Sequence, residues 1–223
     1  MYNSFIDLSL AGTKLPIDDT RRKEGKVMSV NLQKGQKVDL TKGNTGLKAL
    51  VVGLGWDEAP RKFSFFSKRE DIDCDASAIL INAQTDKLSG PADVVYYGQL
   101  THISGAIRHC GDNLTGAGDG DDEQIFVELN KVPAEYSKIV FVVTIYKAQE
   151  RKQQFGMIKN AFIRIVDADT GNELCKYNLS ENYEGKTAMI FGEVYRYNNE
   201  WKFGAIGEPT TDNGIAEMAA RFQ

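Results

Sequence analysis

Most apolar segments of the chain after residue 46 are short, strand-like and separated by turn residues. The run KIVFVVTIY at residues 138–146 is β-branched and nearly continuous, which is typical of a strand buried on both faces. Further strand-like runs occupy residues 47–56, 76–83, 93–98, 125–129, 161–168, 187–197 and 200–207. Many short strands joined by glycine-rich turns predict a mainly β protein, an antiparallel β-sandwich with a few short helices.

Turns and helices complete this prediction. Asp169–Asn172 and Asn198-Asn199 have the composition of hairpin turns. One short helix is expected over residues 148–154. A second is expected in the C-terminal sequence GIAEMAARF, where four apolar residues share a face at helical spacing: Ile215, Met218, Ala219 and Phe222.

Residues 1–27 are weakly patterned and differ from the rest of the chain. They form either an extra strand with a linker or an extension upstream of a domain at residues 28–223, and we favour the extension. The apolar patch at residues 5–11 contains Asp7 and precedes the positive charges, unlike a secretory signal. The longest mostly apolar run, residues 139–146, is far shorter than the ~20 residues of a membrane-spanning helix.

The cysteines predict a reducing compartment. The chain has three cysteines, Cys74, Cys110 and Cys175. An odd number of cysteines with no CxxC pair argues against a disulfide framework. We therefore expect a cytoplasmic protein with free thiols.

The charge of the chain is small but localised. Lys plus Arg number 27 and Asp plus Glu number 31, so the net charge of −4 provides no electrostatic surface for nucleic acid. Residues 112–123, here called the acidic loop, carry five carboxylates and no basic residue. Residues 70–75, here called the acidic segment, carry four more. Negative charge concentrated in two segments indicates binding sites more than a general solubilising surface.

The acidic loop, DNLTGAGDGDDE, has features of a calcium site. Its carboxylates repel one another unless a cation neutralises them, although a solvated charged turn is the simpler interpretation of such a run. Glycines at positions 116, 118 and 120 let the backbone turn its carbonyls inward. Carboxylate and carbonyl oxygens suit Ca²⁺ better than Zn²⁺. The loop is not an EF-hand, because Leu114 and Gly116 occupy two of the ligand positions of that motif.

The acidic segment complements this loop. In DIDCDAS, period-two alternation places Asp71, Asp73 and Asp75 on one strand face with Ser77, and Cys74 and its apolar neighbours on the other. If the fold brings this face to the acidic loop, up to eight carboxylates meet, and two adjacent Ca²⁺ ions are reasonable.

Other motifs are weaker. Gly53-Leu54-Gly55 suggests a dinucleotide loop, but Glu58 stands where the third glycine is needed, and a turn at a strand end is the better interpretation. His109-Cys110 falls short of a tetrahedral metal set. The sequence contains no phosphate-binding loop and no nucleophile motif, and we therefore expect no enzyme activity.

These segments together resemble the TerD family of bacterial tellurium-resistance and stress proteins. The resemblance covers about residues 28–207. It includes MSVNLQKGQKVDL, VVGLGWD, DIDCDASAILI, GDNLTGAGDGDDE, IFVELNKVP, IVFVVTIYKAQERKQQFG, NAFIRIVD and TAMIFGEVYRYNNEWKFGAIG. It implies a β-sandwich that binds calcium.

Positions that match the family motifs imply the metal ligands. They are the side chains of Asp71, Asp73, Asp75, Asp112, Asn113, Asp119, Asp121, Asp122 and Glu123, with the carbonyls of Gly118 and Gly120. No catalytic residue and no organic cofactor is implied.

The resemblance also implies a function in resistance to tellurite and to other chemical or phage stress. The leading hypothesis is a binding or scaffold module whose acidic loop is ordered by Ca²⁺. Its implied partners are other tellurium-resistance proteins, some membrane-bound, in the cytoplasm or at the inner face of the membrane.

Two alternatives stay open. One is Ca²⁺-dependent attachment to anionic lipid, although Leu114 is the sole large apolar residue in the loop. The other is a thiol-dependent enzyme acting on tellurite, which the unclustered cysteines and the anion-repelling loop disfavour.

Overall fold

The computed structural model describes residues 29–58, 71–112, 120–179, 181 and 183–223. The predicted N-terminal extension therefore lies outside the described residues, as do three predicted ligands, Asn113, Gly118 and Asp119. For Asp112 the backbone is described and the side chain is not.

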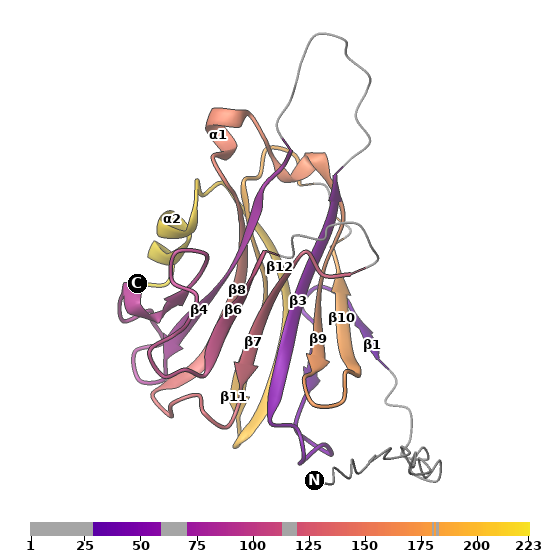
Figure 1. The fold of residues 1–223 in the computed structure, drawn as a ribbon, viewed down its shortest axis with the longest axis vertical. Coiled ribbons are helices and arrows are strands. Elements are labelled where there is room, and N and C mark those ends of the chain that lie inside the picture. The colour runs from indigo at the N-terminus through magenta and orange to yellow at the C-terminus, as the bar shows by residue number, and fades with distance from the viewer. Residues whose placement is uncertain (1–28, 59–70, 113–119, 180, 182) are drawn as a thin grey trace, which may run out of the picture.

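The described strands form two six-stranded sheets that pack face to face (Figure 1). The first, sheet A, has the order β1 (Val30–Leu32), β10 (Glu173–Asn178), β9 (Ile158–Asp167), β3 (Ala49–Glu58), β7 (Glu123–Glu128) and β6 (Ile107–Asp112). The second, sheet B, has the order β2 (Lys37–Asp39), β12 (Glu200–Thr210), β11 (Ala188–Tyr197), β8 (Tyr136–Ile145), β4 (Cys74–Asn82) and β5 (Val94–Val95). Neighbouring strands are antiparallel except β1 and β10, which confirms the predicted antiparallel sandwich.

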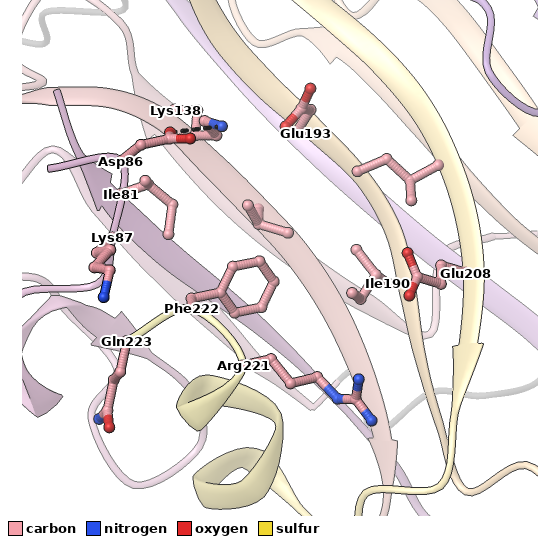
Figure 2. Close-up of a pocket in the computed structure, with 12 residues that line it drawn as sticks. Ile81, Asp86, Lys87, Lys138, Ile190, Glu193, Glu208, Arg221, Phe222 and Gln223 are labelled. Carbon is pink, nitrogen blue, oxygen red and sulfur yellow. Dashed lines mark ion pairs between the residues drawn. The ribbon is translucent and has the colours of Figure 1, made fainter.

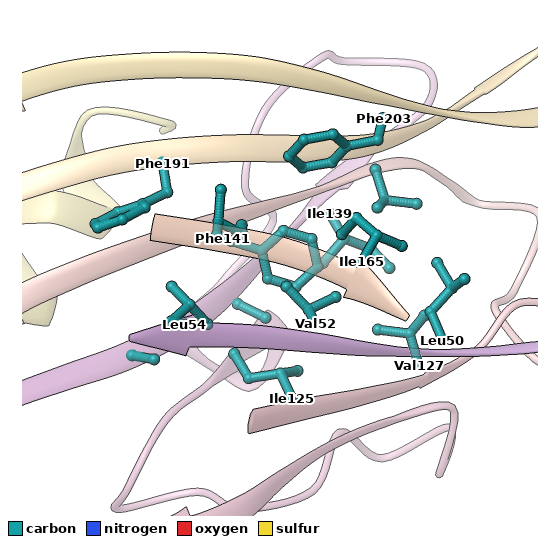
Figure 3. Close-up of a cluster of buried hydrophobic side chains, with 14 of the residues drawn as sticks. Leu50, Val52, Leu54, Ile125, Val127, Ile139, Phe141, Ile165, Phe191 and Phe203 are labelled. Carbon is teal, nitrogen blue, oxygen red and sulfur yellow. The ribbon is translucent and has the colours of Figure 1, made fainter. Parts of the chain in front are cut away.

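The main core fills the space between the sheets. Leu50, Val52 and Leu54 alternate along β3 and are fully buried, facing Phe141 of β8 and Phe203 of β12 (Figure 3). Alternation along each strand sends every second side chain into this space, and burial of these apolar groups is the main force that holds the two sheets together.

Strand β8 is buried on both faces, as its continuous apolar sequence predicts. Ile139 and Phe141 point into the main core, whereas Val140 and Val142 belong to a second cluster on the outer face of sheet B. Helix α2 (Ile215–Ala220) covers that outer face with Met218. The predicted C-terminal helix is therefore confirmed, and its burial of the outer face explains why β8 needs no polar alternation.

The first predicted helix is shorter than expected. Helix α1 covers Ala148–Arg151 and ends because Lys152 adopts a left-handed conformation with φ of 53°. Two short 3₁₀ helices also occur, Pro91–Asp93 and Phe155–Met157. The paired asparagines 198 and 199 both have positive φ, 50° and 63°, which suits the tight hairpin predicted between β11 and β12.

Two local predictions are wrong. Gly53 and Gly55 do not form a strand-end turn, because β3 continues through them to Glu58. Asp71 and Asp73 do not lie on a strand face, because β4 begins at Cys74. Cys74 and Ala76 do face the main core as predicted.

None of the helices described in this chain is long and apolar enough to cross a lipid bilayer.

Candidate functional site

The acidic segment and the start of β7 meet where the two sheets approach each other. Glu123 opens β7 in sheet A, is only 3% exposed, and accepts a hydrogen bond from the backbone N–H of Ala76 in sheet B. Burial raises the pKa of the nearby Cys74 thiol, and Asp75, Glu123, Asp73 and Asp122 raise it further. Carboxylates from both acidic regions therefore act on one thiol, so the fold brings the two regions together.

Asp121 is held on the outer face of sheet A. The residue is 4% exposed, and its carboxylate accepts hydrogen bonds from Arg164 Nε at 2.7 Å and Nη2 at 3.1 Å. Gln124 Nε2 donates a further bond at 2.9 Å. A Cβ atom at Gly53 would overlap the Asp121 carboxylate. Glycine at position 53 thus makes room for the buried ion pair, which is a packing role that the sequence pattern did not reveal.

Asp122 lies half-buried beside the end of β3. Its Oδ2 accepts a hydrogen bond from the Trp56 backbone N–H at 2.7 Å. Burial raises the pKa of the Asp122 carboxyl, the Trp56 N–H opposes this, and the charges of Asp57 and Asp121 raise the pKa further. Three carboxylates therefore share this corner of the molecule, and a cation bound there would lower their mutual repulsion.

Asp57 is a candidate that the sequence prediction missed. It directly follows VVGLGW at the end of β3 and lines the same cavity as Asp122. The sequence signal that could have identified Asp57 is an acidic residue near the end of an otherwise apolar strand.

The two residues of the His109-Cys110 motif point to different environments. His109 is buried, and its Nδ1 accepts a hydrogen bond from the Gly111 N–H at 3.1 Å. Its Nε2 lies 3.5 Å from Glu123 Oε2. Cys110 is exposed. The imidazole therefore packs against the carboxylate of Glu123, and the pair does not converge on one point.

The acidic segment stays near the surface. Asp71 and Asp73 are exposed and Asp75 is partly buried. The Asp73 side chain is 55% exposed, and its Oδ2 lies 3.9 Å from Arg151 Nη1. These carboxylates are accessible to a cation from solvent.

The donor chemistry suits a hard cation, but the described residues do not complete a coordination shell. Within residues 29–58, 71–112 and 120–223, apart from 180 and 182, no three His, Cys, Asp or Glu side chains are grouped closely enough to hold a metal. The meeting point holds the Cys74 thiol and the His109 imidazole as well as carboxylates, and the carboxylate oxygens are the donors that Ca²⁺ prefers. The remaining predicted ligands, at residues 112–119, have no described side chains.

A second buried polar group joins the loop before β6 to strand β8. His102 Nδ1 lies 2.7 Å from Ser104 Oγ, and its Nε2 lies 3.4 Å from Asp93 Oδ1. Tyr136 donates its hydroxyl to the same carboxylate oxygen at 2.8 Å. Burial raises the pKa of Tyr136, and Asp93 raises it further. The arrangement satisfies buried polar atoms and anchors the loop.

Two cavities open on the outer faces of the sheets. One, about 690 Å³ in volume, lies on sheet A beside Asp122, and its lining includes Trp56, Phe162 and Lys176. The other, about 360 Å³, lies beside α2, where Phe222 and Ile190 face each other and Lys138 pairs with Asp86 (Figure 2). The sheet A cavity is the one that adjoins the acidic loop.

Comparison with known proteins identifies the family. The model of the TerD domain matches residues 28–222. This chain is a member of the TerD family. It is 48% identical over 200 residues to stress response protein SCP2 of Bacillus subtilis, covering 87% of this chain and all of that protein. It is 45% identical over 195 residues to tellurium resistance protein TerD of Serratia marcescens, covering 87% of this chain and 97% of that protein.

Solved structures show the same fold at lower identity. The crystal structure of SAV2460, a protein of unknown function, has a TM-score of 0.62 at 23% identity over 78% of this chain and 95% of its own. A homologue of the telluride resistance protein TerD from Streptomyces coelicolor has a TM-score of 0.57 at 21% identity, covering 75% of this chain and 92% of its own. These structures support the TerD-type sandwich and nothing finer.

Proposed function

We propose that this TerD-family protein is a calcium-binding module that acts in the response to tellurite and other chemical stress. Relatives over most of the chain are named for tellurium resistance and for general stress. The module would present a Ca²⁺-ordered surface to partners, which we expect to be other tellurium-resistance proteins, some of them membrane-bound.

The observation that supports calcium most strongly is the meeting of the two acidic regions across the sheets. Glu123 of sheet A reaches the Ala76 N–H of sheet B, next to Asp75 and Cys74. A cation bound there would link the two sheets at the end where the acidic loop leaves β6. Its charge would offset the repulsion among the converging carboxylates.

The carboxylates would have different roles in such a site. Asp73, Asp75 and Asp122 would contribute donors to the ion, together with the predicted ligands at residues 112–119, whereas the buried Glu123 would hold the Ala76 N–H. Asp121 is bonded to Arg164 and Gln124, so it would coordinate only by exchanging those partners. We therefore propose that Asp121 mainly fixes the loop against sheet A, and we retain the expectation of two ions.

Thermal unfolding tests this proposal. Metal-free protein is melted in chelator, in Ca²⁺ and in Mg²⁺. A site filled at 100 times its Kd adds about 2.7 kcal/mol to the free energy of unfolding, so Ca²⁺ should raise Tm by several degrees and Mg²⁺ by less.

A matched pair of variants separates binding from general electrostatics. Asp73→Asn should remove much of the Ca²⁺-induced rise in Tm, whereas Asp169→Asn, in the exposed turn between β9 and β10, should keep it. An equal rise in both variants would place the ion elsewhere. No rise in the metal-free wild-type protein would contradict calcium binding.

Attachment to anionic lipid is the second candidate, because an aromatic side chain is exposed near the acidic segment. Tyr97 is 53% exposed. Asp75 contributes to the raised pKa of Tyr97, so this ring lies within electrostatic range of that carboxylate. Co-sedimentation with phosphatidylserine vesicles that requires Ca²⁺ and is lost in Tyr97→Ser would favour this candidate.

The thiol chemistry alternative gains little support. Cys74 and Cys175 are buried, and burial raises the pKa of both thiols, which keeps them in the unreactive protonated form.

A further inference from the structure

Apart from Gly120 and Asp122, which belong to the predicted calcium ligands, the sheet A cavity has an ordered lining that the calcium hypothesis does not explain. Three successive rows of side chains cross the outer face of sheet A, two of them on β9 and β10 and the third on β3 and β9. Arg164 pairs with Lys176 in the first row, and Phe162 with Asn178 in the second. The third row is Asp57 and Asn160, joined by a hydrogen bond of 2.8 Å from Asn160 Nδ2. All six residues line the cavity of about 690 Å³.

The first row contains a lysine that is not paired with either of its neighbouring carboxylates. Arg164 is neutralised by Asp121, and its Nη1 lies 3.5 Å from Glu173 Oε2. Lys176 has no ion pair within the described part of the chain, although it stands directly opposite another cation, an arrangement that is unfavourable by itself. Its ammonium instead rests over the Phe162 ring, 3.7 Å from the centroid. An anionic group bound at this row would give Lys176 a charged partner.

The second and third rows differ from the first in chemistry. Phe162 lies flat against the sheet because position 55 is glycine, where a Cβ atom would overlap the ring. When Lys176 moves to an anion, this ring face becomes open for stacking. Asp57, Asn160 and Asn178 then offer acceptors and amide donors for hydroxyl groups or for the edge of a base. Same-face positions on a strand are about 7 Å apart, so the three rows extend over about 13 Å.

We propose that this cavity binds a nucleotide-like phosphorylated ligand. The phosphate would bind Lys176 in the first row, an aromatic ring would stack on the second, and hydroxyl groups would bond to the third. The volume lies within the range of small-molecule sites, roughly 300–1,000 Å³. The proposal does not rest on calcium binding, because Lys176, Phe162, Asn160 and Asn178 are outside the predicted metal-ligand set.

The intrinsic tryptophan signal provides the test. Trp56 lines the cavity, whereas Trp201, the other tryptophan of the chain, is buried in the core. ATP, AMP and inorganic phosphate are titrated into the whole protein in chelator and again in Ca²⁺, with correction for absorbance. We expect saturable quenching by a nucleotide in chelator, weaker binding of phosphate alone, and competition between the two.

Three lysine variants locate the binding site. Lys176→Met keeps the aliphatic stem over Phe162 and removes the charge, and it should raise the Kd at least tenfold. Lys176→Arg should restore most of the affinity. Lys87→Met changes a lysine of the α2 cavity and should leave the Kd unchanged (Figure 2). If Lys176→Met does not fold, Asn178→Ala, at an exposed position, should still weaken binding at least threefold.

Two results would overturn the proposal. One is the absence of saturable quenching by millimolar nucleotide in either buffer. The other is equal affinity in the wild type and the folded Lys176 and Asn178 variants. Failure of Ca²⁺ to stabilise the protein would refute the proposed calcium site and leave this test unaffected, because the titration in chelator needs no metal.

Discussion

The two acidic regions of this protein contain the same side chains in different surroundings. Asp71 and Asp73 of the acidic segment are exposed, whereas Asp121 and Glu123 at the end of the acidic loop are buried and accept hydrogen bonds from N–H donors. Burial commits a carboxylate to its protein partners, because removing them leaves an unpaired charge. We infer that the buried carboxylates hold the site together and that the exposed ones are available to a cation.

The buried ion pair gives the largest expected effect. Arg164→Met leaves the Asp121 carboxylate buried without its cation, which should lower the free energy of unfolding by about 3 kcal/mol. Urea unfolding in chelator measures the loss. The control, Lys202→Met, breaks the 2.8 Å surface pair with Asp39 and should cost much less, because solvent screens that pair. Equal losses in the two variants would show that burial does not distinguish these ion pairs.

The glycine beneath Asp121 gives the next largest effect. Gly53→Ala forces its Cβ against the buried carboxylate, and we expect a loss of about 2 kcal/mol in the free energy of unfolding. Gly90→Ala is the matched control, because a Cβ there meets nothing within 4 Å. If urea unfolding shows that Gly53→Ala is as stable as Gly90→Ala, Asp121 is not held where we describe it.

The contrast between Glu123 and Asp73 is tested by stability in chelator. Glu123→Ala removes the acceptor of the buried Ala76 N–H and should cost about 1–3 kcal/mol. Asp73→Asn changes an exposed side chain and should stay within about 0.5 kcal/mol of the wild type. Guanidinium titrations of both variants measure this difference. A reversed order would mean that the acidic segment is structural.

The smallest expected effect is a loss of folding stability at alkaline pH. It tests the contrast between buried and exposed groups on cysteine thiols. Burial raises the pKa of Cys175 to about 12, so the folded state keeps this thiol protonated while the unfolded state ionises near 9. The stabilisation is complete below pH 9 and is lost as pH rises toward 12. Between pH 9 and 10 this thiol should account for about 1 kcal/mol of lost stability.

Unfolding under reducing conditions at the two pH values measures that loss. Cys175→Ala should show a smaller decline than the wild type, and Cys110→Ala, at an exposed thiol, should decline as the wild type does. Identical declines in all three proteins would contradict the assignment to Cys175.

The sequence pattern predicted the elements that nearby residues specify. It did not predict strands that depend on pairing with strands far away in the sequence. Strand β8 could be predicted because its run of β-branched residues is continuous, and the Asn198-Asn199 turn because asparagine tolerates positive φ. Both signals lie within the segment itself. Strands β1 and β2 have three residues each and depend on pairing with β10 and β12, so no local signal could reveal them.

The candidate site shows the same division. The two acidic regions could be recognised from composition. The fold brings Glu123 to the Ala76 N–H beside Asp75, whereas the convergence of up to eight carboxylates stays a prediction. Arg164 could not be assigned to Asp121, because 43 positions separate them and only sheet packing brings them together. The glycine at position 53 can be read from the sequence, but its role depends on Asp121, which covers it from the segment just before β7.

Direct titration of metal-free protein with Ca²⁺ by calorimetry is the most direct test of calcium binding at the meeting point of the two acidic regions. We predict saturable binding of two ions, a Kd raised at least tenfold in Asp73→Asn, and no change in Asp169→Asn. Absence of binding heat in metal-free protein, confirmed by equilibrium dialysis with labelled calcium, would contradict the proposed function.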